Sequence, residues 1–382
     1  MTTTTYPLVA VPGLFGSKLY YFATPVKGPF DVWPTDDPSV AEYLACDSSG
    51  APLYSEVKVT GIDGYDKMFL WLKEKGYSED DGNLVKAPYD WRLDLETVVG
   101  SDTSDDLISG QPPLAKTISD AAGSSKVDIL CHSMGCLATM TYLKNYGFDK
   151  IHRIIFLAPP LLGTVESYYR LVCGAGPSAA KNIGNEEWAE LFSNMQGVYQ
   201  IGPGQELTSL LGGSFVEVIY NWGSTTVDAK LDFQGAYNLS DDSAVKYIKS
   251  MNLDLLQAAG SWRESVDTWL DGSGNQIDDF GYLLYGVIDD STISGIAPYY
   301  YTESSSVLPD STGIYRATGD QNVLTAGLAD LAALGHYQFD DCDHMEMANC
   351  KLTIDTAVSI LQGNPPSQTT FTCDDDACGK ID

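Results

Sequence analysis

Residues 126–140, KVDILCHSMGCLATM, constrain the fold of this chain more than any other stretch. An apolar run of strand length leads into Ser133, and a helical pattern follows it. A serine at such a turn is typical of a nucleophile elbow, where small residues two positions before and after it avoid collision with the neighbouring chain. Gly135 meets this condition, and Cys131 stands where a glycine is usual. The alternative is a serine that only caps the helix. The expected buried stripe of this helix is Cys136, Leu137, Met140 and Leu143.

Segments of strand length and of helix length alternate through the first 160 residues. Their apolar runs are continuous, which predicts strands buried on both faces, and strand–helix repetition predicts a parallel sheet. The expected class is therefore α/β with a doubly wound, mainly parallel sheet. We expect strands at 7–11, 83–89, 126–131 and 151–159, and helices at 68–77, 113–123 and 133–147.

The alternation breaks between residues 161 and 279, where Gly-rich segments with tryptophan and tyrosine replace it. It returns with strands at 280–287 and 313–320 and a last helix at 352–363, which ends at a glycine followed by prolines. We predict a core made of residues 1–160 and 280–382, with a cap domain inserted at 161–279.

A serine hydroxyl becomes a nucleophile when a histidine takes its proton and a carboxylate orients that histidine. The chain has four histidines. His132 adjoins the serine and is expected to point elsewhere, His152 opens a core strand, and His336 lies in LGHYQFDD. His344 lies in CDHMEM, a polar loop before the last helix, and is the candidate base.

The acid must follow the serine and precede the histidine in the chain. Asp320 in ATGDQNV meets this order and follows a predicted strand. One alternative is that Asp320 only caps a turn after Gly319. The other is that Asp289 or Asp290 serves as the acid.

An ester intermediate needs amide donors for its oxyanion, one from the residue after the nucleophile and one from the loop after the first strand. These would be the amides of Met134 and Leu14. The turn VPGLFG is shaped by Pro12 and Gly13 so that it leaves the Leu14 amide free, although an ordinary strand-ending turn has the same composition.

The chain has eight cysteines, too few for a disulfide scaffold at this length. Cys131 and Cys136 are expected to be buried thiols. The expected disulfides join close pairs in polar loops, and such bridges would favour a secreted location over a cytoplasmic one. Spacing alone leaves the pairing open. The two expected pairs are Cys342 with Cys350 and Cys373 with Cys378.

No motif calls for a metal or another cofactor. The CxxC and CxxH spacings of zinc sites are absent, and the acidic stretch 271–279 fits a hairpin turn better than a calcium loop. The first residues lack the basic and apolar regions of a signal peptide, which leaves export open.

The formal net charge of -30 repels nucleic acid and anionic membrane surfaces. We therefore expect no nucleic-acid partner, and zwitterionic lipid, micelles or soluble esters are easier substrates to reconcile with this charge.

No apolar run approaches the ~20 residues of a membrane span. We expect a monomer.

Several separated motifs make the chain resemble the lecithin:cholesterol acyltransferase and lysosomal phospholipase A2 family. The resemblance extends over about residues 7–362 and is weak in the predicted cap. Two motifs depart from it: GDQNV replaces the usual G-D-G-T-V or G-D-D-T-V, and DHMEM replaces H-x-N-M. The motifs that agree in order are LVAVPGLFGSKL, APYDWRL, CHSMGCL, LAPPLLG, LLYGV, TGD and DHMEM.

The resemblance implies an α/β-hydrolase core in which Ser133, Asp320 and His344 form a triad and the Leu14 and Met134 amides form the oxyanion hole. It also implies acyl transfer from lipid-like esters through a serine ester, by a phospholipase A, lipase or O-acyltransferase. Residues 22–55 occupy the place of a lid or membrane-touching insertion, where Trp33 and the later PYYY at 298–301 could meet a membrane or micelle surface. Residues 90–92 would belong to a structural motif near the site. A carboxylesterase or lactonase for a non-lipid ester, and a catalytically silent lipid-binding protein, are the alternatives.

Overall fold

The computed structural model describes residues 6–213, 216–222, 225–231, 251–272, 276–302, 305–306, 314–326, 328 and 331–379. Seven of the described strands form its central sheet, and every neighbouring pair among them is parallel. Their spatial order is β14 (Thr370–Thr372), β13 (Gly335–Asp340), β10 (Gly281–Thr302), β7 (Ile151–Leu157), β6 (Val127–His132), β1 (Leu8–Val11) and β5 (Leu84–Lys86).

Alternate residues of the central strands pack into two separate apolar clusters. In β1, Val9 and Val11 belong to one cluster, and Leu8 and Ala10 belong to the other. The first cluster includes buried residues of α3 (Leu114–Ala122) and α4 (Met134–Tyr146), and the second includes those of α1 (Asp66–Glu74) and α13 (Lys351–Leu361). Burial on both faces explains the continuous apolar runs, and the expected α/β class with a mainly parallel sheet is confirmed.

The strands in the second part of the predicted core, residues 280–382, differ from expectation. The predicted strand at 280–287 is the first part of a longer β10, whose second part pairs antiparallel with β12 (Ile314–Gly319) and parallel with β8 (Val216–Trp222). Register shifts between Ile288 and Thr292 separate the two parts. β13 and β14 extend the parallel sheet. The sequence did not predict these two strands, because their segments are short and partly polar.

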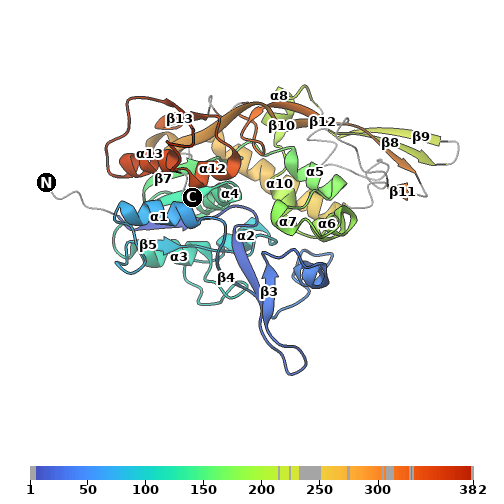
Figure 1. Ribbon diagram of the computed structural model, residues 1–382, viewed down its shortest axis with the longest axis horizontal. Coiled ribbons are helices and arrows are strands. Elements are labelled where there is room, and N and C mark those ends of the chain that lie inside the picture. Colours follow the sequence, from blue (N-terminus) through green and yellow to red (C-terminus); the bar gives the residue numbers. More distant parts are fainter. Residues whose placement is uncertain are drawn as a thin grey trace.

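The two predicted insertions have their own elements. Residues 22–55 contribute to a three-stranded antiparallel sheet of β2 (Ser17–Tyr21), β3 (Phe30–Trp33) and β4 (Val57–Ile62), and the β2–β3 turn projects from the molecule (Figure 1). The division into core, cap and lid stays a prediction. The remaining elements are η1 (Pro38–Leu44), α2 (Leu95–Val99), α5 (Glu166–Cys173), η2 (Ser178–Ala180), α6 (Asn185–Phe192), α7 (Gln196–Gln200), α8 (Gln205–Leu210), β9 (Thr225–Leu231), α10 (Leu253–Leu270), α11 (Ile277–Phe280), β11 (Ser305–Ser306) and α12 (His344–Asn349).

Some sequence expectations fall on parts that the structure describes incompletely. The side chains of PYYY at 298–301 and residues 273–275 of the acidic stretch lie outside the described residues. Among the helices that are described, none has the length and apolar composition to cross a bilayer.

The expected disulfide pairing is wrong. Cys350 is bonded to Cys378, while Cys342 and Cys373 are free thiols. The reason is that β14 pairs with β13 and brings the C-terminal segment back against the start of α13, so proximity in the sequence does not decide the partners. Cys131 and Cys136 are buried free thiols, as expected.

Candidate active site

Ser133 occupies a sharp turn between β6 and α4. Its φ of 53° and ψ of -128° lie in a region that L-residues rarely adopt, and its side chain makes no capping hydrogen bond to α4. The arrangement therefore differs from the simple helix cap that was the alternative. Such backbone strain costs about 1–3 kcal/mol and is concentrated at functional sites.

Two small residues allow this turn, as the elbow pattern requires. A Cβ atom on Gly135 would lie 2.4 Å from the Pro12 carbonyl oxygen, so the chain there has no room for a side chain. Cys131 is fully buried, and its thiol donates to the Ile155 carbonyl oxygen at 3.5 Å. Cysteine is thus small enough at the position where glycine is usual.

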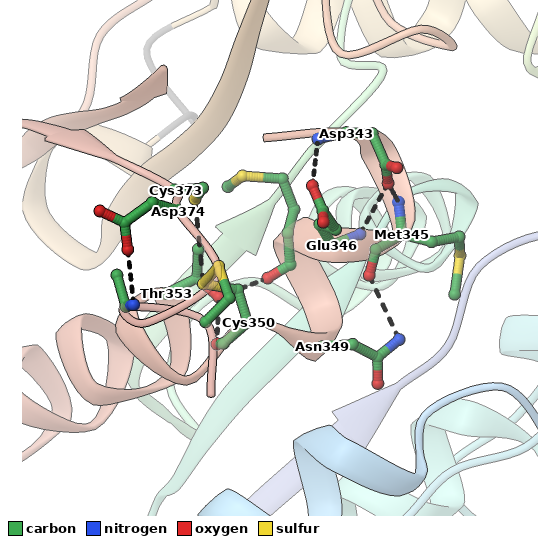
Figure 2. The surroundings of a disulfide bond; sticks show 11 residues. Asp343, Met345, Glu346, Asn349, Cys350, Thr353, Cys373 and Asp374 are labelled. Carbon is green, nitrogen blue, oxygen red and sulfur yellow. Dashed lines mark hydrogen bonds between the residues drawn. A yellow bond between two sulfur atoms is a disulfide. The ribbon is translucent and has the colours of Figure 1, made fainter. Parts of the chain in front are cut away.

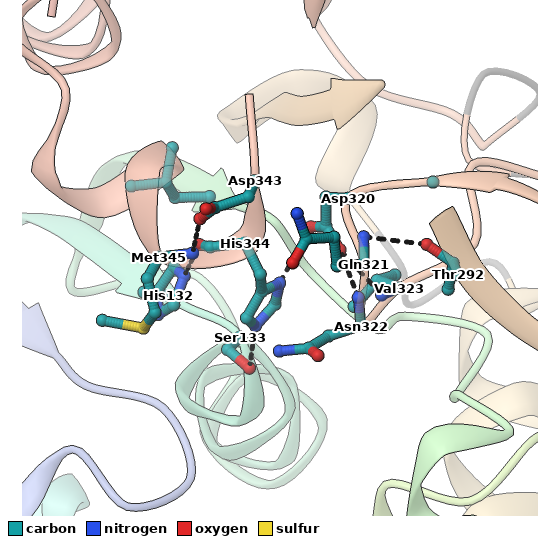
Figure 3. A network of polar contacts seen from close by, with 12 residues as sticks. His132, Ser133, Thr292, Asp320, Gln321, Asn322, Val323, Asp343, His344 and Met345 are labelled. Carbon is teal, nitrogen blue, oxygen red and sulfur yellow. Dashed lines mark hydrogen bonds and ion pairs between the residues drawn. The ribbon is translucent and has the colours of Figure 1, made fainter. Parts of the chain in front are cut away.

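Three of the predicted site residues meet in one hydrogen-bonded chain (Figure 3). Ser133 Oγ lies 2.8 Å from His344 Nε2, and His344 Nδ1 lies 2.8 Å from Asp320 Oδ2. A carboxylate only accepts, so Nδ1 carries the hydrogen and Nε2 is free to accept from the serine hydroxyl. The imidazole is therefore oriented to receive the Ser133 proton.

Asp320 is held by backbone amides as well as by the histidine. Its side chain is buried, and Oδ1 accepts from the amides of Val323 at 2.7 Å and Asn322 at 3.1 Å. The alternative acids lie elsewhere: Asp289 is exposed and accepts from the Thr318 hydroxyl, and Asp290 is also exposed. Of the three candidate acids, only Asp320 contacts His344.

His344 is the first residue of the helix α12, whereas the sequence predicted that it lies in a polar loop. Asp343 caps this helix and Glu346 completes a reciprocal capping box. The His344 amide also donates to the Asp320 carbonyl oxygen at 2.8 Å. The base is therefore fixed by a helix start and by its own acid partner, which lowers the entropy cost of aligning the imidazole.

The turn after β1 passes directly over Ser133. A Cβ atom on Gly13 would lie 2.7 Å from Ser133 Cβ, and the Gly16 amide closes the turn by donating to the Gly13 carbonyl oxygen. Leu14 follows in this turn and lines the same cavity as Ser133. Met134 begins α4, where the first amides have no acceptor within the helix. The two predicted oxyanion donors thus belong to segments on either side of Ser133.

Sequence reasoning missed a buried polar link beside the serine. Tyr65 accepts the Gly13 amide at 2.8 Å and lies 2.7 Å from His132 Nδ1, while His132 Nε2 lies 2.9 Å from the His344 carbonyl oxygen. Since a carbonyl only accepts, Nε2 carries the hydrogen and the Tyr65 hydroxyl donates to Nδ1. The link thus joins the turn after β1, which was predicted to supply an oxyanion donor, to the backbone of the candidate base.

Burial keeps both members of this link neutral. It lowers the pKa of His132 well below its usual range, and the neighbouring His344 acts in the same direction. Burial also raises the pKa of the Tyr65 phenol. A distance of 52 residues between Tyr65 and Gly13 left no local pattern by which the sequence could reveal the contact.

The APYDWRL motif forms a buried ion pair near the site. The Arg92 guanidinium donates to both Asp90 carboxylate oxygens at 2.7–2.8 Å, and both side chains are fully buried. Arg92 also donates to the carbonyl oxygens of Tyr43 and Leu44. Burial is the largest single influence on the pKa of Asp90 and raises it, but the charge and hydrogen bonds of Arg92 and the hydrogen bond from the Ser109 hydroxyl together lower that pKa. The pair attaches part of 22–55 to the core.

A cavity of about 470 Å³ opens at Ser133 and His344. Its apolar wall includes Leu14, Phe15 and Trp33, whereas Glu166 and Arg170 form an ion pair in its wall with a 3.1 Å contact. Both predicted insertions contribute, since Trp33 comes from 22–55 and Arg170 from 161–279. The cavity can hold an apolar chain beside a hydroxyl nucleophile.

One group of potential metal ligands occurs in the described part of the chain, away from Ser133. The sulfur atoms of Cys350, Cys373 and Cys378 lie within 4.8 Å of one another. Two of them are joined in the disulfide, so they are not thiolate ligands in this form.

Comparison with known proteins gives a family and a fold. A family model described as lecithin:cholesterol acyltransferase matches residues 49–259, which is more than half of the 382 residues. No curated protein matches the chain. The crystal structure of the Tle4-Tli4 complex contains a similar chain, with a TM-score of 0.53 and 12% identity, and the match covers 95% of this chain and 98% of that chain.

Two lipase structures are also similar, at lower scores. Bacillus licheniformis lipase BlEst2 in mature form has a TM-score of 0.39 and 13% identity, covering 94% of this chain and 92% of that chain. Aspergillus fumigatus lipase B has a TM-score of 0.39 and 14% identity, covering 99% of this chain and 57% of that chain. On the family match, the chain belongs to the lecithin:cholesterol acyltransferase family and is, in general terms, a lipid acyl-ester hydrolase or acyltransferase.

Proposed function

We propose that this protein cleaves or transfers the acyl group of lipid-like esters through a covalent ester on Ser133. The observation that carries the proposal is the continuous chain of two 2.8 Å hydrogen bonds from Ser133 through His344 to Asp320, at a strained elbow that opens into a cavity. A serine hydroxyl in this arrangement can lose its proton as it attacks.

The first half-reaction forms the acyl-enzyme. Ser133 Oγ attacks the ester carbonyl while His344 Nε2 takes its proton, and Asp320 stabilises the imidazolium that forms. The amides of Leu14 and Met134 donate to the oxyanion. When the tetrahedral intermediate collapses, His344 gives the proton to the departing alkoxide, so an alcohol leaves and the acyl group stays on Ser133.

The second half-reaction decides between hydrolase and transferase. Water or an acceptor alcohol donates its proton to His344 as it attacks the acyl-enzyme, and Ser133 regains a proton when the product acid or ester departs. An enclosed site that excludes water favours an alcohol acceptor. Leu14, Phe15 and Trp33 supply apolar surface for the acyl chain in this scheme.

We further propose that residues 22–55 act as a lid that meets a lipid surface, and that residues 161–279 act as a cap over the site. The exposed β2–β3 turn carries Phe22, which is 49% exposed, and Val26, which is 94% exposed. Apolar side chains on a projecting turn can enter the edge of a bilayer or micelle. Replacement of Val26 by Asp should weaken binding to vesicles of zwitterionic lipid without altering turnover of a soluble ester.

The test of the proposed chemistry combines labelling and product analysis. The enzyme is treated with a fluorophosphonate probe and, separately, with a panel of phospholipids, triglycerides, lactones and p-nitrophenyl esters, with and without an alcohol acceptor. Mass spectrometry then identifies the modified peptide and the products. We expect the probe on Ser133 and higher kcat/KM for long acyl chains.

Variants distinguish the nucleophile from other serines. Ser133→Ala should abolish labelling and turnover. Ser265→Ala should retain both, because the Ser265 hydroxyl is hydrogen-bonded to the Lys144 ammonium and the Trp262 carbonyl oxygen, outside the cavity. Full activity in Ser133→Ala would exclude the mechanism. Turnover of short esters or lactones alone would favour a non-lipid esterase, and ligand binding without turnover would favour a silent lipid-binding protein.

A further inference from the structure

Four cysteines gather where the C-terminal segment meets the start of α13. Cys350 is bonded to Cys378, and Cys373 Sγ lies 3.8 Å from Cys350 Sγ (Figure 2). The neighbouring Cys373 thiol raises the pKa of the Cys342 thiol. The cluster therefore contains one disulfide and two free thiols that lie near each other.

The backbone holds the two free thiols together independently of their sulfur atoms. β14 is parallel to β13, and the Cys373 amide donates to the Asp340 carbonyl oxygen at 2.9 Å. Cys342 follows the end of β13 by two residues. The strand pairing therefore holds Cys373 beside the chain that carries Cys342.

Cys342 lies close in the sequence to the candidate base. It precedes His344 by two residues, and the His344 amide donates a hydrogen bond to the Asp320 carbonyl oxygen. A covalent link from Cys342 to the C-terminal segment would fasten that segment to the chain that presents the candidate base.

We propose that Cys342 and Cys373 are a second disulfide-forming pair, which with Cys350–Cys378 makes a two-bridge clasp between the C-terminal segment and the α12–α13 region. The oxidant is a small disulfide such as oxidised glutathione. Cys373 reacts first because it is 8% exposed, whereas Cys342 is completely buried.

The chemistry balances with one equivalent of oxidant. The Cys373 thiolate attacks one sulfur of oxidised glutathione, which forms a mixed disulfide and releases one glutathione thiolate. The Cys342 thiolate then attacks Cys373 Sγ and releases the second glutathione. The two protein thiols lose two protons and two electrons, and two molecules of reduced glutathione carry them away.

The second step is slow in the folded protein. The neighbouring Cys373 thiol and burial both raise the pKa of Cys342, so its thiolate is scarce. The clasp should therefore close fastest while the chain folds or opens locally. An experiment has to allow such openings.

The test maps the disulfides of the whole chain. The protein is equilibrated in a glutathione redox buffer with urea below the unfolding transition, alkylated in denaturant, digested without reductant and examined by mass spectrometry. We expect peptides that link Cys342 to Cys373 and Cys350 to Cys378, and four alkylated cysteines among the eight.

Three results would overturn the proposal. Cys342 and Cys373 could both be alkylated beside an intact Cys350–Cys378 bond, or Cys373 could be linked to Cys350 after exchange. All four thiols could instead be reduced and retain zinc, as metal analysis of the purified protein would reveal.

Variants test whether the pair acts without the existing disulfide. The difference in Tm between oxidised and reduced protein should persist at roughly 3 °C or more in Cys350→Ala/Cys378→Ala, because the second bridge still closes a loop of about 30 residues. Cys342→Ala/Cys373→Ala/Cys350→Ala/Cys378→Ala should lose the difference. Cys46→Ala, a buried free thiol elsewhere, should retain that of the wild type. A redox-independent Tm in Cys350→Ala/Cys378→Ala would refute the second bridge.

Discussion

Removal of the Tyr65 hydroxyl tests whether the link between the turn after β1 and His344, the proposed base, is functional. In Tyr65→Phe, the Gly13 amide loses its acceptor and His132 Nδ1 loses its donor, and both groups stay buried. Each buried group without a partner costs about 1–3 kcal/mol. If about 2 kcal/mol of this total is lost as stabilisation of the transition state, the activation free energy rises by the same amount and kcat falls roughly 30-fold.

Tyr199→Phe is the matched control for this change. Tyr199 is also buried, and its hydroxyl accepts the Asn252 amide and donates to the Ser193 carbonyl oxygen, both at 2.8 Å. Each substitution therefore removes a hydroxyl that accepts from one backbone amide and donates to one acceptor. Of these two tyrosines, Tyr65 is the one that hydrogen-bonds to the turn over Ser133, so only Tyr65→Phe should change kcat.

The assay separates catalysis from stability. Steady-state hydrolysis of a p-nitrophenyl ester gives kcat and KM, and thermal unfolding gives Tm for both variants. We expect similar losses of Tm, a KM within about threefold of the wild type, and a lower kcat only in Tyr65→Phe. If both variants lose Tm equally while both retain kcat, the Tyr65 link is structural and the reasoning fails.

Other parts of the structure give three further predictions. Asp90→Asn should destabilise the fold by about 3–5 kcal/mol in urea unfolding, because it leaves Arg92 charged and buried without its partner; a change below 1 kcal/mol would contradict the burial of the pair. Gly135→Ala should cost about 1–3 kcal/mol and most activity, because the new Cβ would lie 2.4 Å from the Pro12 carbonyl oxygen; unaltered Tm and turnover would be inconsistent with the tight elbow. Since burial places the folded pKa of His132 below its unfolded value, its contribution to stability is present above pH ~6.5 and is lost by up to ~1.4 kcal/mol per pH unit as the pH falls. His132→Asn should therefore reduce the loss of Tm between pH 6.5 and 5, and an unchanged slope would show that His132 is not held neutral.

Local sequence patterns were sufficient for five of the seven strands of the central sheet and for the serine turn. The apolar run before Ser133, the helical pattern after it and Gly135 all act within a few residues, so the elbow could be predicted from its own segment. Asp320 and His344 could be selected because chain order limits where an acid and a base can follow the serine. The contact of His344 with Ser133 follows from the parallel sheet, because β13 and β6 end at the same edge. Asp320 follows β12, which pairs antiparallel with the second part of β10, so its contact with His344 does not follow from the parallel strands.

Contacts between distant segments could not be predicted in the same way. The partner of Cys350 depends on β14, a strand of three residues whose pairing with β13 leaves little trace in the sequence. Tyr65 and His132 are 67 residues apart, and nothing in the pattern around either residue indicates the other. Both outcomes depend on tertiary packing rather than on local propensity.

The departure of GDQNV from the family pattern affects the cavity more than the acid. Gln321 has a φ of 79°, a value that suits glycine, and its amide donates to the Thr292 hydroxyl. The Asp320 carboxylate is held by the amides of residues 322 and 323, which any side chain at those positions leaves in place. Asn322, in contrast, lines the cavity beside Ser133. The altered residues therefore leave the hydrogen-bonded chain of Ser133, His344 and Asp320 intact and change the cavity wall that a substrate contacts. Differences from other family members in the preferred acceptor or acyl group should thus depend on Asn322 rather than on Asp320.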